Sequence, residues 1–298
     1  MRFNRIIYII FLFHISRSTC ISQCVGLDAE SGPDLFTCDP NMMVQLNGSV
    51  QGTYKKFMWT PSVGLSNAQV LDPMVTLKTP GIYKFKLIAE GLSSNNLVVN
   101  GDFESGNTGF TSGYIYGFPG FFGYGYYGVG TNPNLYWSGF TSCGDHTTGS
   151  SNMLIVDGSQ TAGTNVWCQT IPVTIGKTYQ FEFYVQSIYP PSPCQLNMTM
   201  NGVSFGNITG GAVCDWLKFE GCFTATSASA KICISEMSGI ASGNDFAIDD
   251  IALYEKCIDE DEVIVEIVDL KAVINIPIRP KCSSEVFDLA GIGSSTGP

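Results

Sequence analysis

The sequence YQFEFYVQ, residues 179–186, alternates apolar and polar side chains without interruption. Side chains of a β-strand point alternately to the two faces of a sheet, so the apolar residues of this stretch share one face. The same two-residue period recurs at Leu196, Met198 and Met200 and again at Ile232 and Ile234. No stretch between residues 94 and 257 keeps a helical period, so two layered sheets are expected there.

Turn residues divide the chain into three segments. Residues 25–92 hold short strand-like runs separated by turn dipeptides such as Asn47-Gly48, as in a small sandwich of about seven strands. Residues 94–257 form the longer β-rich unit. Near the end, CSSEVFDLAGIG repeats the order of cysteine, strand and glycine turn seen in CDPNMMVQLNGS near the start. Residues 258–298 are therefore expected to begin another small sandwich of a longer, repeat-bearing protein.

The first residues have the pattern of an export signal. Arg2 and Arg5 precede an apolar core, IIYIIFLF at residues 6–13, and small or neutral residues follow it. This core is too short to anchor the chain across a bilayer. Residues 1–24 are therefore expected to be a signal peptide of a secreted or cell-surface protein. The alternative is a lipoprotein signal with Cys20 acylated, although the residues before it match that pattern poorly.

Composition narrows the range of partners. The net charge of −11 argues against nucleic acid and against binding to anionic lipid by charge, because both need a basic surface. An acidic chain is compatible with calcium, which prefers oxygen ligands. Eleven cysteines in an exported chain predict disulfides. Their connectivity stays open, and pairs such as Cys194 with Cys214 or Cys222 with Cys233 would require neighbouring strands.

Acidic residues occur at both ends of the long unit. NGDFE at residues 100–104 follows its first strand, and FAIDDIALYEKC at 246–257 is expected to be its last strand. The apolar residues of that last strand change phase at Asp249-Asp250, which predicts a β-bulge. Carboxylates from both strands, together with loop carbonyls, can build a calcium cage of about six to eight oxygens. Alternatively, Asp102 and Glu104 cap turns while Asp249 and Asp250 form salt bridges.

Three motifs resemble the framework of galactose-binding-like jelly rolls: NGDFESG at 100–106, DHTTG at 145–149 and FAIDDIALYEKC at 246–257. Two branches are similar, the carbohydrate-binding modules found beside bacterial polysaccharide hydrolases and the MAM domains of cell-surface adhesion proteins. The chain departs from the MAM pattern in lacking a cysteine just before NGDFE. The resemblance implies a two-sheet jelly roll over 94–257 with a structural calcium. Its implied ligands are Glu104 and one of Asp249 or Asp250, with Asp102 and Asp145 as further candidates.

The first segment carries a second resemblance. WTPSVGL at 59–65 and Gly81-Ile82-Tyr83 are similar to PKD-like, immunoglobulin-type modules, which serve as spacers or adhesive repeats in bacterial surface proteins. The resemblance implies a PKD-like, Ig-like sandwich over 25–92 and a truncated one over 258–298.

A run of aromatic residues, GYIYGFPGFFGYGYYG at 113–128, is here called the aromatic segment. Phe118-Pro119-Gly120-Phe121 has the signature of a type II turn, which predicts a hairpin. Exposed aromatic rings can stack on sugars while tyrosine hydroxyls form hydrogen bonds. The alternatives are contact with a protein and structural covering of the sandwich edge. The candidate ligand-binding residues are Tyr114, Tyr116, Tyr124 and Tyr126.

Groups for catalysis are scarce. Beyond the export signal the only histidine is His146, and no G-x-S-x-G motif is present. A two-carboxylate glycosidase has no fixed spacing and stays open, as does a catalytic domain beyond Pro298. We therefore expect a non-catalytic, calcium-stabilised region that binds a polysaccharide or glycan. The alternative is a protein-recognising adhesion or a structural stalk without a sugar ligand.

Overall fold

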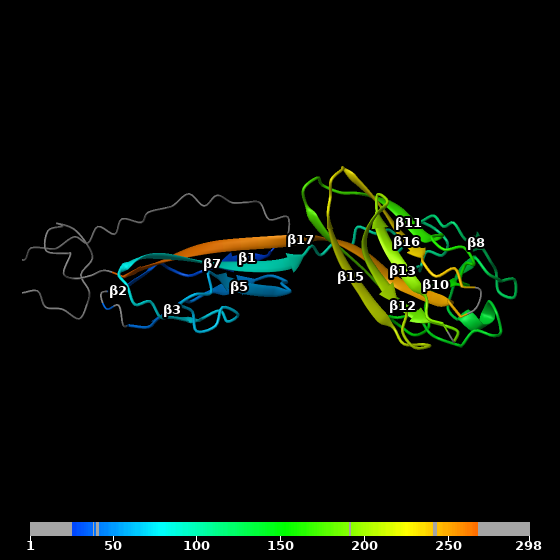
Figure 1. Cartoon of the computed structure of the whole chain (residues 1–298), viewed down its shortest axis with the longest axis horizontal. Coiled ribbons are helices and arrows are strands. Elements are labelled where there is room, and N and C mark those ends of the chain that lie inside the picture. The colour runs from blue at the N-terminus through cyan, green and yellow to red at the C-terminus, as the bar shows by residue number, and fades with distance from the viewer. Residues whose placement is uncertain (1–25, 38, 40–41, 191, 241–242, 268–298) are drawn as a thin grey trace, which may run out of the picture.

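A computed structural model describes residues 26–37, 39, 42–190, 192–240 and 243–267. These residues form an elongated molecule of two β-sandwich units (Figure 1). The all-β prediction is confirmed, because one short 3-10 helix is the only helix in the described ranges. No described helix is long and apolar enough to cross a membrane. The expected export segment, residues 1–24, lies outside the described residues.

The N-terminal unit is built from short strands around a core that contains Leu46, Trp59, Phe85 and Leu87. β5 pairs with β7, while β1–β4 and β3–β6 form small two-stranded sheets. The strands are β1 (Asp28–Glu30), β2 (Leu35–Thr37), β3 (Val44–Gln45), β4 (Ser49–Gln51), β5 (Lys56–Thr60), β6 (Met74–Val75) and β7 (Gly81–Leu92).

The C-terminal sandwich packs two sheets against each other. The order in one sheet is β15-β12-β17-β10-β9-β8, and in the other it is β11-β16-β13-β14. The elements introduced here are β8 (Ile115–Tyr116), β9 (Tyr126–Gly130), η1 (Pro133–Leu135), β10 (Met153–Val156), β11 (Asn165–Pro172), β12 (Thr178–Ser187), β13 (Gln195–Met200), β14 (Val203–Thr209), β15 (Leu217–Thr224), β16 (Ser229–Glu236) and β17 (Phe246–Ile267).

The core between these sheets contains the apolar residues that the two-residue period predicts. The apolar residues of β12, at positions 179, 181, 183 and 185, are all buried. They belong to one core with Leu196 and Met198 of β13 and Ile232 and Ile234 of β16. Fully burying one such side chain stabilises the fold by roughly 1.5–3 kcal/mol. The polar residues of β12 consequently point to the outer face of the sheet.

One strand, β17, belongs to both units (Figure 1). Its first part pairs antiparallel with β10 and β12 of the C-terminal sandwich. Its second part pairs antiparallel with β7 and parallel with β2 of the N-terminal unit. The C-terminal sandwich is therefore inserted into the N-terminal unit, which takes its last strand from beyond the insertion.

Residues 258–267 were expected to begin a further domain, but they complete the N-terminal unit instead. Asp259 and Asp261 accept hydrogen bonds from backbone N–H groups near β1 at 2.8 and 2.9 Å. Glu260 and Glu262 point to the other face and pair with lysines of β7 at 2.6 and 2.7 Å. The acidic run at residues 259–262 is thus part of a paired strand. Residues 268–298 lie outside the described residues.

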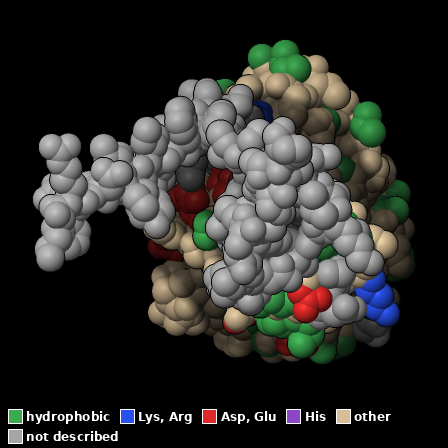
Figure 2. Space-filling model, turned by 90° about the vertical axis from the view of Figure 1, so that its left-hand side faces the viewer, with side chains coloured by type: hydrophobic (Ala, Val, Ile, Leu, Met, Phe, Trp, Pro, Cys, Tyr) green, Lys and Arg blue, Asp and Glu red, His purple; other side chains and the backbone are tan. Residues whose placement is uncertain are grey.

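Seen end-on from the N-terminal unit, acidic side chains reach the surface among hydrophobic ones (Figure 2).

Disulfides join Cys143 with Cys214 and Cys168 with Cys233. Cys168 and Cys233 face each other across β11 and β16, which suits the short Cα–Cα distance of 4.2 Å. Both pairs considered from the sequence are wrong, because Cys194 and Cys222 are free. Cys222 faces Gln180, on the opposite strand, rather than another cysteine.

Candidate functional site

The outer face of the larger sheet carries a cleft of about 350 Å³, which we call the outer-face cleft. β12 contributes the polar side of its alternating pattern, and β17 contributes residues on the solvent side of its bulge. The residues that matter for its chemistry are Asn96, Asp102, Glu182, Tyr184, Asp250 and Tyr254. Lys218 of β15 lies at the side of this cleft, bonded to Glu182 at 3.1 Å.

The predicted β-bulge is confirmed one residue further along, at Asp250-Ile251, because Asp249 still pairs with Tyr184, and it shapes the cleft. The register of β12 and β17 shifts between Glu182 and Tyr184, and Asp250 has a φ of 51°. Such a bulge leaves strand N–H and C=O groups without ladder partners, and these groups must be satisfied elsewhere. Asn96 does so, since its side chain donates to Ile251 O at 3.1 Å and accepts from Leu253 N at 3.0 Å.

The segment that forms one wall of the cleft packs tightly on this bulge. The backbone N–H of Ile251 donates to Gly101 O at 2.9 Å. A Cβ at Gly101 would lie 2.0 Å from the carbonyl oxygen of Ile251, so only glycine fits this approach. The NGDFE motif therefore has a structural role here: it brings residues 96–102 against the last strand and closes one side of the cleft.

Two tyrosines line the cleft, and they differ in whether another ring is stacked on them. The ring of Tyr184 is stacked on the ring of His146, with centroids 3.5 Å apart, and Lys218 Nζ lies 5.7 Å from its centroid. In the described part of the chain, no ring or cation is stacked on Tyr254. Burial and the charge of Glu182 raise the pKa of Tyr254, so its hydroxyl stays protonated at neutral pH. Tyr254 thus offers both a ring face and a hydrogen-bond donor.

Charge in the cleft is mostly negative. Asp102, Glu182 and Asp250 contribute carboxylates, and Lys218 is bonded to Glu182 and, at 2.6 Å, to Glu220. Burial alone would lower the pKa of Lys218, but its hydrogen bonds to Glu220 and Glu182 raise it. The cation therefore stays charged and is already paired within the protein.

Most of the predicted calcium ligands accept hydrogen bonds from a single loop, residues 145–152, and their carboxylates do not converge on one point. Asp145 accepts from Thr148 N at 2.9 Å and from Ser151 N at 2.8 Å. Glu104 and Asp249 accept from the backbone N–H groups of Asn152 and His146 at 2.8 and 2.9 Å. Asp250 Oδ2 lies 2.7 Å from His146 Nδ1, while Asp102 lies apart in the cleft wall.

The ion site implied by the resemblance would use Glu104 and one of Asp249 or Asp250, with Asp102 and Asp145 as further candidates. Within the described residues, no group of three or more His, Cys, Asp or Glu side chains is placed to hold a metal ion. Burial and the neighbouring Asp250 and Asp145 raise the pKa of Asp249 to about 7, although hydrogen bonds oppose this. Burial alone would raise the pKa of Asp145, but hydrogen bonds from Thr148 and Ser151 lower it below its usual value. Calcium stays a prediction that unfolding with and without a chelator can check.

The aromatic segment does not form the expected hairpin. The turn itself is confirmed, since Phe121 N donates to Phe118 O at 2.8 Å and Gly120 has a φ of 76°. The chain on either side of it, however, pairs in parallel as β8 and β9. The predicted tyrosines therefore do not share one face. Tyr114 is only 6% exposed, Tyr116 and Tyr124 are 37% and 57% exposed, and Tyr126 is half-buried.

Tyr114 belongs to a buried polar cluster that sequence reasoning missed. Its hydroxyl donates to Glu236 Oε2 at 3.1 Å, and the same carboxylate oxygen accepts from Ser159 N at 3.0 Å. Asp157 and Asp245 are buried beside each other in the same region. Burial and the proximity of Asp245 raise the pKa of Asp157 to about 8. Tyr114 is therefore a structural residue and not part of an exposed platform.

Sequence reasoning also missed Tyr184, Tyr254 and Glu182. Tyr184 and Glu182 occupy polar-face positions of the very stretch that predicts the fold, and an aromatic ring on the polar face of a strand was the available signal. Tyr254 follows the bulge, so its direction depends on where the phase changes. Only the fold brings these residues next to Asn96 and Asp102.

No protein-family model matches the chain, and no curated protein matches it as a relative. Among solved structures, the chain is similar to a family 16 carbohydrate-binding module, with 18% identity and a TM-score of 0.33 over 53% of this chain and 99% of that one. It is also similar to the CBM22-1 xylan-binding domain from Paenibacillus barcinonensis, with 14% identity and a TM-score of 0.30 over 42% of this chain and 88% of that one. Because these TM-scores are low, the similarities carry no argument about function, and the function proposed below rests on the cleft.

Proposed function

We propose that this chain is a non-catalytic, carbohydrate-binding region of an exported protein and that the outer-face cleft holds the sugar. The observation that carries the proposal is the free ring of Tyr254 in a cleft lined with carboxylates. A sugar ring has apolar C–H faces that pack on aromatic rings, and its hydroxyls need hydrogen-bond acceptors. Tyr254 supplies the ring, while Glu182 and Asp102 supply acceptors.

The charge of the cleft selects among sugars. Three carboxylates, from Asp102, Glu182 and Asp250, surround the position, and Lys218 is engaged by glutamates. A uronic-acid polymer would bring like charges close together, which costs binding energy. Hydroxyl groups of a neutral sugar can donate to the same carboxylates. The ligand is therefore a neutral glycan.

A non-catalytic role agrees with the state of His146. Its Nδ1 is bonded to Asp250 at 2.7 Å and its ring lies on Tyr184, so it fixes the cleft wall. The disulfides Cys143–Cys214 and Cys168–Cys233 support an oxidising, extracellular setting.

The experiment is a screen of the full chain on an array of neutral and acidic glycans, followed by titration calorimetry on the strongest neutral hit. Tyr254→Ala should weaken binding at least about tenfold, which corresponds to about 1.4 kcal/mol. Tyr124→Ala, in the exposed aromatic segment, is the matched control and should bind like the wild type. If Tyr124→Ala loses binding while Tyr254→Ala binds like the wild type, the site lies in the aromatic segment. If the chain binds no glycan at all, the proposal is overturned.

A second candidate function is an adhesion surface for a protein. Phe118, Phe121 and Tyr124 are exposed in the aromatic segment, and no charged residue occurs between Glu104 and Asp145. Exposed rings of this kind are enriched at protein contacts. A chain that binds no glycan yet captures a surface protein through these rings would favour this function.

A further inference from the structure

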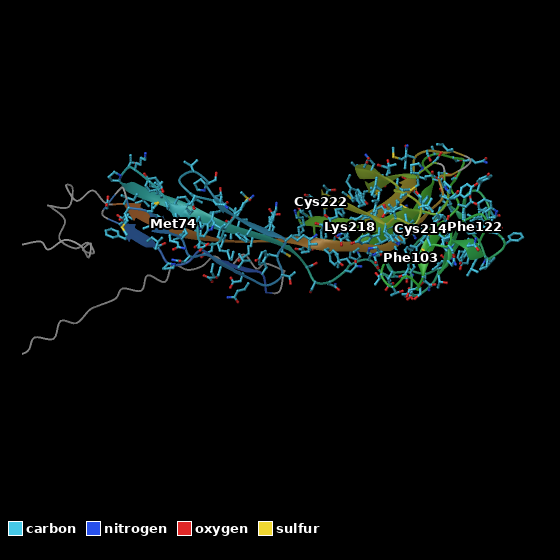
Figure 3. The ribbon with its side chains drawn as sticks, turned by 90° about the horizontal axis from the view of Figure 1, so that it is seen from below. Met74, Phe103, Phe122, Cys214, Lys218 and Cys222 are labelled. Carbon is cyan, nitrogen blue, oxygen red and sulfur yellow. A yellow bond between two sulfur atoms is a disulfide. The ribbon has the colours of Figure 1, made fainter. Side chains whose placement is uncertain are left out.

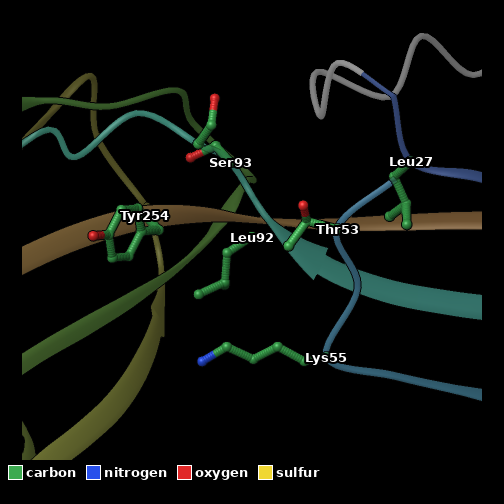
Figure 4. A pocket seen from close by; sticks show the side chains of 7 residues that line it. Leu27, Thr53, Lys55, Leu92, Ser93 and Tyr254 are labelled. Carbon is green, nitrogen blue, oxygen red and sulfur yellow. The ribbon is translucent and has the colours of Figure 1, made fainter. Parts of the chain in front are cut away.

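A second hollow, of about 210 Å³, lies where the two units meet (Figure 4). We call it the junction hollow. Its lining includes Leu27, Thr53, Lys55, Leu92 and Ser93. Tyr254 lines it as well, and Tyr254 also lines the outer-face cleft. The two hollows therefore meet at Tyr254, the residue proposed to carry the sugar.

The two hollows are held in a fixed relation. β17 passes through the junction without a break, and its Glu255 exchanges hydrogen bonds with Ser93 at 2.9 and 3.1 Å. Lys55 of the N-terminal unit forms an ion pair with Glu220 of β15 at 3.5 Å. A continuous paired strand does not hinge as a flexible linker does. The junction is thus pre-organised, which lowers the ordering cost of binding across it.

The chemistry of the junction hollow complements that of the cleft. The outer-face cleft offers mainly acceptors, from Glu182 and Asp102. The junction hollow offers hydroxyls, from Thr53 and Ser93, beside two leucines and the ammonium group of Lys55, which is half-exposed in its ion pair with Glu220. Sugar hydroxyls both donate and accept, and apolar side chains suit their C–H faces. Both hollows therefore suit the same class of neutral ligand.

We propose that the two hollows form one groove that binds an extended, neutral polysaccharide chain along β17. Tyr254 lies at its centre, and Thr53 and Lys55 make the N-terminal unit part of the binding site instead of a spacer. This inference rests on the proposed function, because it extends the same site. It explains why the C-terminal sandwich is inserted into the N-terminal unit, since β17 then sets the two halves of one site in register.

The test is calorimetry of the full chain with cello-oligosaccharides and xylo-oligosaccharides of two and six sugars. Thr53→Trp fills the junction hollow from an exposed position, and Thr226→Trp, at an exposed turn away from both hollows, is the matched control. The hexasaccharide should bind the wild type about tenfold more tightly than the disaccharide. Thr53→Trp should remove that gain and leave disaccharide binding unchanged, whereas Thr226→Trp should keep both.

The outcomes separate this inference from the proposed function. If Thr53→Trp binds both oligosaccharides like the wild type while Tyr254→Ala binds neither, the cleft stands and the junction subsite is wrong. If Tyr254→Ala also binds like the wild type, the proposed function falls with it. Lys55→Met gives a second measurement, since it should weaken the hexasaccharide alone.

Discussion

The aromatic segment and the outer-face cleft both expose tyrosines, but they differ in how those rings are brought together. The aromatic segment gathers its rings by local composition, and the structure then divides them between interior and surface. The cleft gathers Tyr184 and Tyr254 from strands that are distant in the chain. Lys218, at the cleft, and Phe122, in the aromatic segment, lie well apart along the molecule (Figure 3). Density of rings in a sequence therefore does not locate a binding surface; strand register does.

Truncating Tyr114 and Tyr124 tests whether the fold divides the rings of the aromatic segment between interior and surface. Tyr114 is buried against Glu236, so Tyr114→Ala should cost about 3–5 kcal/mol of unfolding free energy, as large aromatic truncations in cores do. Tyr124 is exposed, so Tyr124→Ala should stay within about 0.5 kcal/mol of the wild type. Urea unfolding followed by tryptophan fluorescence measures both. Equal stabilities for the two variants would mean that Tyr114 is not part of the core.

The aromatic segment is hydrogen-bonded to the backbone of Asp157, so the stability of this region should depend on pH. Asp157 N donates to Tyr126 O at 2.9 Å, and Gly125 N donates to Asp157 O at 3.0 Å. Burial and the neighbouring Asp245 raise the pKa of Asp157 to about 8. The folded state thus holds a proton that the unfolded chain releases near pH 4, so stability should fall as pH rises from about 4 to about 8.

Asp157→Asn removes this titration and still donates hydrogen bonds towards Asp245. The variant should be more stable than the wild type at pH 9 and should show a flatter decline between pH 4 and 8 in thermal unfolding. Asp249, whose pKa burial raises to about 7, adds a decline of the same sign to both proteins. Asp102→Asn, at an exposed carboxyl, is the control. A variant as pH-dependent as the wild type would show that Asp157 does not titrate in this range.

Local patterns account for the features that sequence reasoning predicted correctly. The period of residues 179–186 depends only on strand geometry, and the phase change at Asp249-Asp250 depends only on which residues of one strand are apolar. Neither feature needs knowledge of a partner strand. The core of the C-terminal sandwich and its bulge were therefore predictable.

Pairing between distant segments accounts for what could not be predicted. Residues 258–267 pair with β7, and nothing in their own sequence distinguishes that pairing from the start of a new domain. Cys168 and Cys233 become neighbours only when β11 and β16 pair. The cleft likewise needs Asn96 to satisfy the bulge of β17, a contact that joins the two ends of the sandwich.

Removing Lys218 should change stability and glycan affinity least, and it separates the contribution of charge from that of ring stacking. Its ion pairs with Glu182 and Glu220 lie at the surface, where such pairs contribute about 0–1 kcal/mol. Lys218→Ala should therefore lower the unfolding free energy by less than about 1 kcal/mol, and should weaken neutral-glycan binding only about threefold because Glu182 loses its partner. Calorimetry in low and high salt checks this against Tyr254→Ala. A loss as large as that of Tyr254→Ala would mean that Lys218 contacts the sugar directly, so that charge rather than the free ring distinguishes the cleft from the aromatic segment.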